Sequence, residues 1–297
     1  MTALFSKGWT APFLFFRYLP SIDITFSWFA SVYSSLLVFL ARCFRLKSII
    51  VLGGVDVAKE KDLHYGIWNS RWKSHIVRYG ITHASAILAV DESLRHDAMR
   101  LAHYGGENIS VVPTGYDAQY WTPSGEKEQF VLTVAKCRDM TRVKLKGIDV
   151  LISVARSSPD LRFLVVGIDP LMSEQLDIPS NFKCVDFSPP ELLRGFYQSA
   201  KVYCQLSYRE GLPNSLCEAM LCECVPVGTN VGGIPDVIGE TGFVLPYNDV
   251  VRTREAIYIA MGSEPDLGHR ARLRIAARYT LSQRENSLRK TIMDLME

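Results

Sequence analysis

Segments typical of strands alternate with segments typical of helices along most of this chain, and this alternation constrains the fold more than any other feature. Strand-like runs lie at residues 24–29, 48–52, 84–90, 109–112, 130–135, 162–166, 182–185, 202–206, 225–228 and 243–245. Helix-like runs lie between them at residues 32–45, 71–79, 92–103, 147–155 and 190–199, and three more are expected before the C-terminus. Such alternation favours parallel sheets covered by helices on both faces. The sequence therefore predicts an α/β fold.

The length of 297 residues is enough for two domains, each with its own core. Residues 116–127 are rich in Asp, Pro, Gly and Ser and have no apolar period, so they are interpreted as an interdomain linker. We therefore expect a first domain at 1–118 and a second at 119–278. A C-terminal helix at 279–297 is expected to pack back on the first domain.

Composition excludes several classes of function. The net charge of +2 gives no general attraction to nucleic acid, and 48% hydrophobic with 22% charged residues is typical of a globular chain. The seven cysteines are odd in number and contain no C-x-x-C pair, which indicates reduced thiols in a cytoplasmic protein and no zinc site. Three of them, Cys217, Cys222 and Cys224, are expected to fill the core.

Residues 24–41 form an uncharged stretch of eighteen residues that must be weighed as a membrane span. Its serines and its natural division into a strand and a helix favour instead a buried βαβ unit that ends in the strand 48–52. Residues 42–78 follow, with eight Lys or Arg against three Asp or Glu, a local balance of +5. This basic patch predicts peripheral attachment to an anionic membrane surface on the cytoplasmic side.

Residues 210–220, Glu-Gly-Leu-Pro-Asn-Ser-Leu-Cys-Glu-Ala-Met, carry the strongest functional signal. Pro213 suits the first position of a helix, whose free amides at Asn214, Ser215 and Leu216 would favour an anion. Glu218 lies on an otherwise apolar helix, where an unpaired carboxylate is costly and needs donors. Phosphate at the helix start and sugar hydroxyls on Glu210 and Glu218 would satisfy every group. The pattern therefore predicts a nucleotide-sugar site.

The same segment, with Val-Pro-Val-Gly at 225–228 and Val-Gly-Gly-Ile-Pro-Asp at 231–236, resembles the group 1 retaining glycosyltransferases of the GT-B fold. The resemblance implies two Rossmann-type domains whose parallel sheets face a cleft, with acceptor on the first domain and nucleotide sugar on the second. It also implies that Glu210 contacts the transferred sugar and Glu218 the ribose. Neighbouring donor-binding positions are then Gly211, Leu212, Asn214 and Ser215.

Transfer from a nucleotide sugar requires charge stabilisation of the leaving diphosphate. The sequence contains no Asp-x-Asp metal anchor, so we expect no metal and no cofactor, and protein cations must supply this charge. Residues 136–149 provide five of them. Lys146 matches the Lys-Gly pair that the family places before a helix, and the second family cation could be Lys136, Arg138 or Arg142. A solvated basic loop is the alternative interpretation.

Further site residues are expected around the nucleotide base and the acceptor. Phe187 and Ser188 follow a strand where the family holds the base, although Ser188 with Glu191 could also form a helix capping box. Gly232 and Gly233 could allow close approach of a ligand or simply form a turn. Asp56 and His64 could contact the acceptor hydroxyl. An Asp-stabilised turn and an exposed histidine are the alternatives.

The beginning of the chain departs from the family pattern, because no strand with a glycine-rich turn precedes residue 24. The first domain is therefore expected to be abbreviated, as in a fragment or a reduced branch of the family. The predicted function is transfer of a sugar, of the hexosyl type, to a polysaccharide or glycolipid hydroxyl in cell-envelope or polysaccharide biosynthesis, with a lipid-linked acceptor among the partners. A catalytically silent nucleotide-sugar-binding relative is the main alternative, and a sugar-nucleotide epimerase is a third.

Overall fold

The computed structural model describes residue 8 and residues 10–297. The chain divides into two compact units: the first comprises the residues up to Pro113 together with 285–297, and the second comprises Thr114–Arg284. The expected boundary at 118 lies just beyond this division. The helix expected at 279–297 is α13 (Leu281–Met296), of which the part from Glu285 groups with the first unit.

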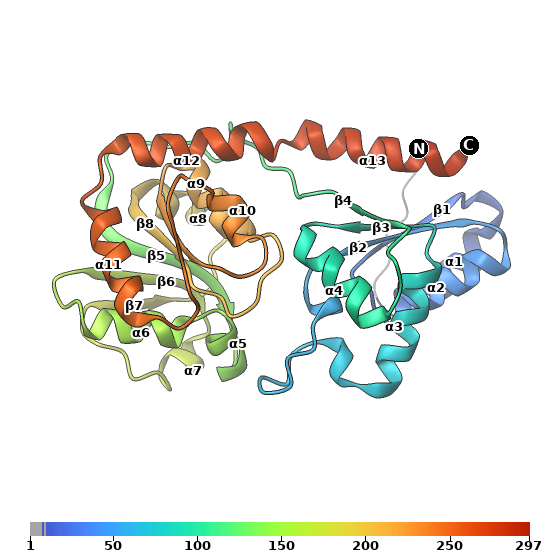
Figure 1. The fold of residues 1–297 in the computed structure, drawn as a ribbon, viewed down its shortest axis with the longest axis horizontal. Coiled ribbons are helices and arrows are strands. Elements are labelled where there is room, and N and C mark those ends of the chain that lie inside the picture. Colours follow the sequence, from blue (N-terminus) through green and yellow to red (C-terminus); the bar gives the residue numbers. More distant parts are fainter. Residues whose placement is uncertain (1–7, 9) are drawn as a thin grey trace. The chain divides into compact units, whose positions relative to one another are not determined.

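The first unit is built on a four-stranded parallel sheet (Figure 1). Its strands are arranged in chain order as β1 (Ile24–Trp28), β2 (Lys47–Leu52), β3 (Ala86–Ala89) and β4 (Ile109–Val111). The helices of this unit are α1 (Thr10–Tyr18), α2 (Val32–Cys43), α3 (Arg71–His83) and α4 (Glu92–Ala102). The sequence patterns predicted all of these elements except α1. The side chain of Asp91 caps α4 by accepting from the Ser93 amide.

The uncharged stretch 24–41 forms β1 and most of α2, and β1 pairs in parallel with β2. The predicted βαβ unit is therefore confirmed. The expectation that it is wholly buried is wrong, because β1 is an edge strand on which Phe26 and Trp28 are 42% and 60% exposed. Among the described residues, no helix combines the length and apolar character needed to span a bilayer.

The second unit contains a six-stranded parallel sheet in the order β10-β9-β8-β5-β6-β7. Its strands are β5 (Glu128–Cys137), β6 (Arg162–Ile168), β7 (Phe182–Val185), β8 (Ala200–Gln205), β9 (Val225–Thr229) and β10 (Phe243–Leu245). Strands β6 and β7 follow β5 on one side of it, and strands β8, β9 and β10 follow on the other side. The first and fourth strands of this sheet in chain order, β5 and β8, are therefore neighbours. In open α/β sheets, ligands bind beyond the carboxyl ends of the strands at such a switch point.

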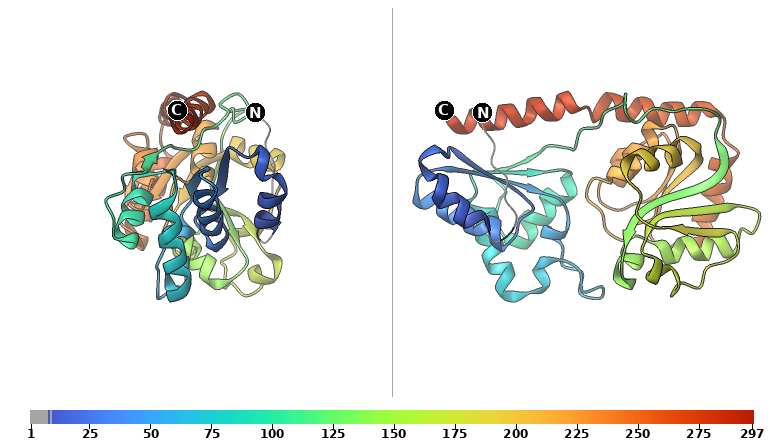
Figure 2. Two further views of the ribbon diagram at one scale, coloured as in Figure 1. Left: turned by 90° about the vertical axis from the view of Figure 1, so that its right-hand side faces the viewer. Right: turned by 180° about the vertical axis from the view of Figure 1, so that it is seen from behind.

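Helices cover both faces of this sheet (Figure 2). The helices α6 (Ile148–Arg156) and α11 (Val250–Met261) enclose one core with inward side chains such as Val131, Val202 and Val227. On the other face α8 (Pro190–Ser199), α9 (Asn214–Leu221) and α12 (Pro265–Arg278) pack together. Short helices lie at α5 (Met140–Leu145), α7 (Pro170–Ser173) and α10 (Ile234–Ile238).

Three local predictions need correction. The basic segment expected to be a loop contains α5, which the side chain of Asp139 caps by accepting from the Arg142 amide at 2.8 Å. The capping box at Ser188 is wrong, since α8 begins after Pro189 without a side-chain cap. The proline of the site helix also lies one position earlier than predicted, because Pro213 is the N-cap of α9.

The segment 116–127 contains no helix or strand, as a linker should, but it is held firmly by the second unit. Tyr116 and Trp121 are buried. Arg272 of α12 donates hydrogen bonds to the carbonyl oxygens of Ala118 and Trp121. Lys127 donates to the carbonyl oxygen of Tyr197 at 2.8 Å. The segment is therefore part of the packed second unit.

Candidate active site

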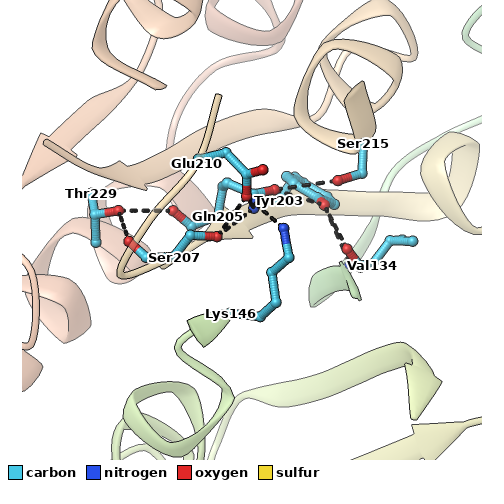
Figure 3. A network of polar contacts seen from close by, with 8 residues as sticks. All are labelled: Val134, Lys146, Tyr203, Gln205, Ser207, Glu210, Ser215 and Thr229. Atoms are coloured by element: carbon cyan, nitrogen blue, oxygen red, sulfur yellow. Dashed lines mark hydrogen bonds and ion pairs between the residues drawn. The ribbon is translucent and has the colours of Figure 1, made fainter. Parts of the chain in front are cut away.

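A short ion pair lies at the switch point of the second unit. Lys146 follows β5 and α5, and Glu210 follows β8, so the topology brings together two residues that are distant in sequence. The Lys146 Nζ donates to the Glu210 Oε2 at 2.6 Å (Figure 3). These side chains are only 22% and 15% exposed, which makes the contact a partly desolvated, charge-assisted hydrogen bond. The two residues that the sequence marked as central are thus in direct contact.

Two glycines allow the backbone to pack tightly around this pair. Gly147, which follows Lys146, has a φ of +66°, and a Cβ there would lie 2.0 Å from the carbonyl oxygen of Leu206. Gly232 has a φ of +54°, and a Cβ there would lie 2.1 Å from the carbonyl oxygen of Glu210. Only glycine satisfies both constraints. A turn with positive φ therefore explains Gly232, whereas Gly233 has an ordinary φ of −79° and donates to the carbonyl oxygen of Gly211.

The carboxylate of Glu210 is further oriented by two residues that the sequence analysis did not select. Ser207 and Gln205 donate to the same Oε2 at 2.9 and 3.1 Å (Figure 3). The Gln205 Oε1 in turn accepts from the hydroxyls of Tyr203 and Ser215 at 3.2 and 3.3 Å. This network connects Glu210 with the first turn of α9. In the part of the chain that the structure describes, all three donors to Glu210 use Oε2, which leaves Oε1 able to accept from a ligand.

Glu218 lies on α9, where the hydroxyl of Tyr197 donates to its Oε2 at 3.1 Å. Burial raises the pKa of Glu218 to about 7, although the hydrogen bond from Tyr197 acts in the opposite direction. Tyr197 is fully buried, and its ring packs edge-on against Trp121 at 5.6 Å between centroids. Trp121 of the segment 116–127 therefore packs against Tyr197, and Tyr197 in turn holds the carboxyl of Glu218.

The start of α9 has the features expected of an anion site. Its N-cap residue is Pro213, which provides no side-chain hydrogen bond to the first amides. The Oδ1 of Asn214 accepts from the hydroxyl of Tyr116 at 2.7 Å, and Asn214 itself is exposed. Gly211 and Leu212, which precede the helix, are buried in the packed loop. A residue of the linker segment thus helps to position the first residue of the site helix.

The other predicted donor-side residues form a second group. The Nζ of Lys136 lies 5.3 Å from the ring centroid of Phe187, which is 63% exposed. Burial raises the pKa of the Cys137 thiol to about 12, while the charges of Lys146 and Arg142 act in the opposite direction, so both cations lie near the end of β5. Ser188 is buried and its hydroxyl donates to the Asp186 carbonyl oxygen at 3.4 Å. Of the three candidates for the second cation, Arg142 is the one whose charge acts on the same thiol as Lys146.

The first unit does not support the acceptor role predicted for Asp56. Its side chain is 1% exposed and accepts from the amides of Ala30, Gly53 and Gly54, at 2.7 Å for Gly54. Burial raises the pKa of Asp56, and these amide hydrogen bonds act against that increase. Asp56 is therefore the stabiliser of a turn, as the alternative interpretation held. His64 is exposed, with a φ of +47°.

Among residues 8 and 10–297, no group of three His, Cys, Asp or Glu side chains is arranged to hold a metal ion. All seven cysteines are free, and Cys217, Cys222 and Cys224 are buried, as expected for core residues.

Comparison with known proteins now identifies the class to which this fold and site belong. Residues 122–279 match the family model of group 1 glycosyl transferases, which covers more than half of the chain. The chain therefore belongs to the group 1 glycosyltransferase family, as the motifs indicated.

Individual relatives agree with this assignment. The chain is 24% identical over 250 residues to N-acetyl-alpha-D-glucosaminyl L-malate synthase of Bacillus anthracis; the match covers 77% of this chain and 62% of that relative. The chain thus spans about three fifths of the length of this relative.

Solved structures confirm the α/β architecture with parallel sheets. Sucrose-phosphate synthase from Thermosynechococcus elongatus is similar with a TM-score of 0.79 at 17% identity, over 95% of this chain and 76% of that one. HepE of Anabaena, solved in complex with UDP and glucose, is similar with a TM-score of 0.77 at 14% identity, over 96% and 83%. At these identities the likeness concerns the fold, which is that of the GT-B glycosyltransferases.

Proposed function

We propose that this chain transfers a sugar, of the hexosyl type, from a nucleoside-diphosphate sugar to a hydroxyl acceptor with retention of the anomeric configuration. The observation that carries the proposal is the contact between Lys146 and Glu210 at the switch point, beside the uncapped start of α9. A cation, oriented carboxylate oxygens and free helix amides are the groups that a sugar diphosphate requires. The crystallised complex of HepE with UDP and glucose supports the choice of donor class.

In this proposal the Oε1 of Glu210 accepts a hydrogen bond from a hydroxyl of the transferred sugar. The carboxylate of Glu218 accepts hydrogen bonds from the ribose hydroxyls. Lys146 carries three donor protons, so it can keep its bond to Glu210 and also donate to the diphosphate. Arg142, for which Lys136 and Arg138 are the alternatives, adds a second cation. Charge from these side chains and from the start of α9 stabilises the leaving diphosphate without a metal ion.

Retention is proposed to follow a front-face course. The bond between the anomeric carbon and the diphosphate oxygen breaks, and the acceptor oxygen bonds to the same face of that carbon. The acceptor proton passes to an oxygen of the departing diphosphate. This route needs no protein nucleophile, and the groups around Glu210 serve to position and to stabilise charge. We propose a polysaccharide or glycolipid hydroxyl, lipid-linked acceptors included, as the acceptor class.

The test combines binding and turnover. Calorimetry with UDP, GDP and ADP should show that one nucleoside diphosphate binds, and the matching sugar donors should then give transfer to sugar and glycolipid acceptors. The anomeric configuration of the product, followed by NMR, should equal that of the donor. Binding without transfer across the acceptor panel would favour the silent relative, and inversion would refute the front-face course.

The raised pKa of Glu218 gives this proposal a pH dependence. Ribose hydroxyls donate most strongly to the carboxylate, whereas the ligand-free carboxyl holds its proton up to a pH of about 7. We therefore expect nucleoside-diphosphate affinity to fall about tenfold per pH unit below pH 7 and to level off above it. Calorimetry from about pH 5.5 to about pH 8.5, on both sides of the titration of Glu218, measures this.

Two variants control the pH experiment. Glu218→Gln cannot titrate at this position, so its affinity should be lower and nearly independent of pH. Tyr197→Phe removes the hydroxyl that stabilises the carboxylate, so the midpoint should move to higher pH. A profile of the same shape in Glu218→Gln and in the unsubstituted protein would assign the pH dependence to another group.

A further inference from the structure

An apolar groove lies on the first unit between α2 and α3. It encloses about 440 Å³ and is lined from α2 by Val32, Leu36 and Phe39 and from α3 by Ile76 and Tyr79. Phe39 and Ile76 are 49% and 36% exposed. An apolar groove that is open to solvent is typical of a surface that binds a protein, a membrane or a ligand.

A basic pocket of about 490 Å³ lies where these two helices end. It is lined by Arg42, Arg45 and Lys47, with Glu107 as its one carboxylate. None of the three cations forms an ion pair with any residue among 8 and 10–297. Arg42 lies in the last turn of α2, where the helix dipole alone favours a cation. Arg45 and Lys47 follow the helix, so the dipole does not explain them.

The groove and the pocket adjoin one another. The Tyr79 ring, which lines the groove, stacks on the ring of His83 at 4.2 Å, and His83 lines the basic pocket. On α2, Phe39 of the groove and Arg42 of the pocket are three residues apart and share one side of the helix. The surface is therefore amphipathic along its length, with an apolar channel that ends at unpaired positive charge.

We propose that this surface, formed by the groove and the basic pocket, docks the chain on a membrane that contains anionic phospholipids. Arg42, Arg45 and Lys47 would bind the headgroup phosphate, and the groove would accept part of an apolar chain. The pocket has three cations and one carboxylate, so its net positive charge is complementary to an anionic headgroup. The same charge would make two copies of this surface repel each other. The exposed ring of Phe44 precedes Arg45 in sequence and lies 6.1 Å from the exposed ring of Phe16, and such rings suit a membrane interface.

The proposed membrane docking is independent of the proposed transfer reaction. It assigns the membrane contact to three of the eight cations in the basic patch expected from the sequence. Of the eight cations at 42–78, Arg78 is turned inward toward the carbonyl oxygen of Leu101, and Lys73 lies over the ring of Trp72 at 5.6 Å. Three others, Arg42, Arg45 and Lys47, line one pocket beside the apolar groove.

Vesicle flotation of the whole chain tests the proposal. The protein should float with phosphatidylcholine vesicles that contain phosphatidylglycerol and not with phosphatidylcholine alone, and added salt should weaken the binding. The triple variant Arg42→Gln, Arg45→Gln, Lys47→Gln should lower the partition coefficient roughly 10²-fold, at about fivefold for each charge removed. The matched control Lys183→Gln, Arg252→Gln, Lys290→Gln removes the same charge at exposed positions elsewhere and should change binding less than about threefold.

Phe39→Ser tests the apolar part separately. It should weaken binding to the anionic vesicles severalfold while the salt dependence stays as it was, and circular dichroism should show an unchanged fold. The proposal is overturned if the unsubstituted chain ignores anionic vesicles, or if both triple variants lose binding equally. A concentration-dependent dimer in sedimentation that Phe39→Ser abolishes would assign the groove to a second copy instead.

Discussion

Replacing Lys146 with Ala should lower turnover with the nucleotide-sugar donor by about 10²-fold, which corresponds to roughly 3 kcal/mol of transition-state stabilisation. Lys146 forms an ion pair with Glu210 and directly precedes Gly147, the N-cap of α6. The variant loses the charge that would face the leaving diphosphate, and the carboxylate of Glu210 loses its ionic partner. Affinity for the nucleoside diphosphate should therefore fall together with the rate. Single-turnover kinetics and calorimetry measure the two effects separately.

Lys144→Ala is the matched control for Lys146→Ala. Both lysines belong to the same basic segment, but Lys144 is exposed on α5 and forms no ion pair within the described part of the chain. We expect its kinetics to stay within about twofold of the unsubstituted protein. Equal losses in the two variants would mean that the general positive charge of the segment, and not the position of Lys146, is what matters.

The order and type of most elements were predictable from sequence, because each parallel strand is an apolar run and each covering helix has an apolar stripe. The elements that were missed are short or lack periodicity. The helix α5 has six residues, too few to show a period, and its only local signal was Asp139 before it. The edge position of β1 could not be predicted either, because an apolar edge strand and an apolar buried strand have the same sequence pattern.

The centre of the site was predictable, but its surroundings were not. Lys146 and Glu210 were marked by motif, and the strand order explains why they meet across sixty-four positions of the chain. The sequence did not reveal that Gln205 and Ser207 share the Oε2 of Glu210, although both lie at the carboxyl end of β8. Asp56 could not be assigned either, because a carboxylate after a strand looks the same whether it binds a ligand or backbone amides. Only its hydrogen bonds distinguish the two cases.

Replacing Glu210 with Gln should separate rate from affinity in a way that Lys146→Ala does not. The amide keeps the shape of the side chain and an acceptor for Ser207, but it removes the charge that neutralises Lys146. Sugar hydroxyls then lose a charged hydrogen-bond acceptor worth about 1.5–3 kcal/mol, so turnover should fall roughly 10- to 100-fold. The unneutralised Lys146 should bind the nucleoside diphosphate as tightly as before or severalfold more tightly.

The exposed Glu240 provides a control, since Glu240→Gln makes the same chemical change in the same unit and should alter neither quantity. The double variant Lys146→Ala, Glu210→Gln completes a cycle in which the losses should not add, because the two side chains share one contact. If Glu210→Gln instead weakened diphosphate binding as much as Lys146→Ala, the carboxylate would be needed to hold the lysine in place. If turnover were unchanged, the ion pair would serve only to hold the loop after β8 against the start of α6.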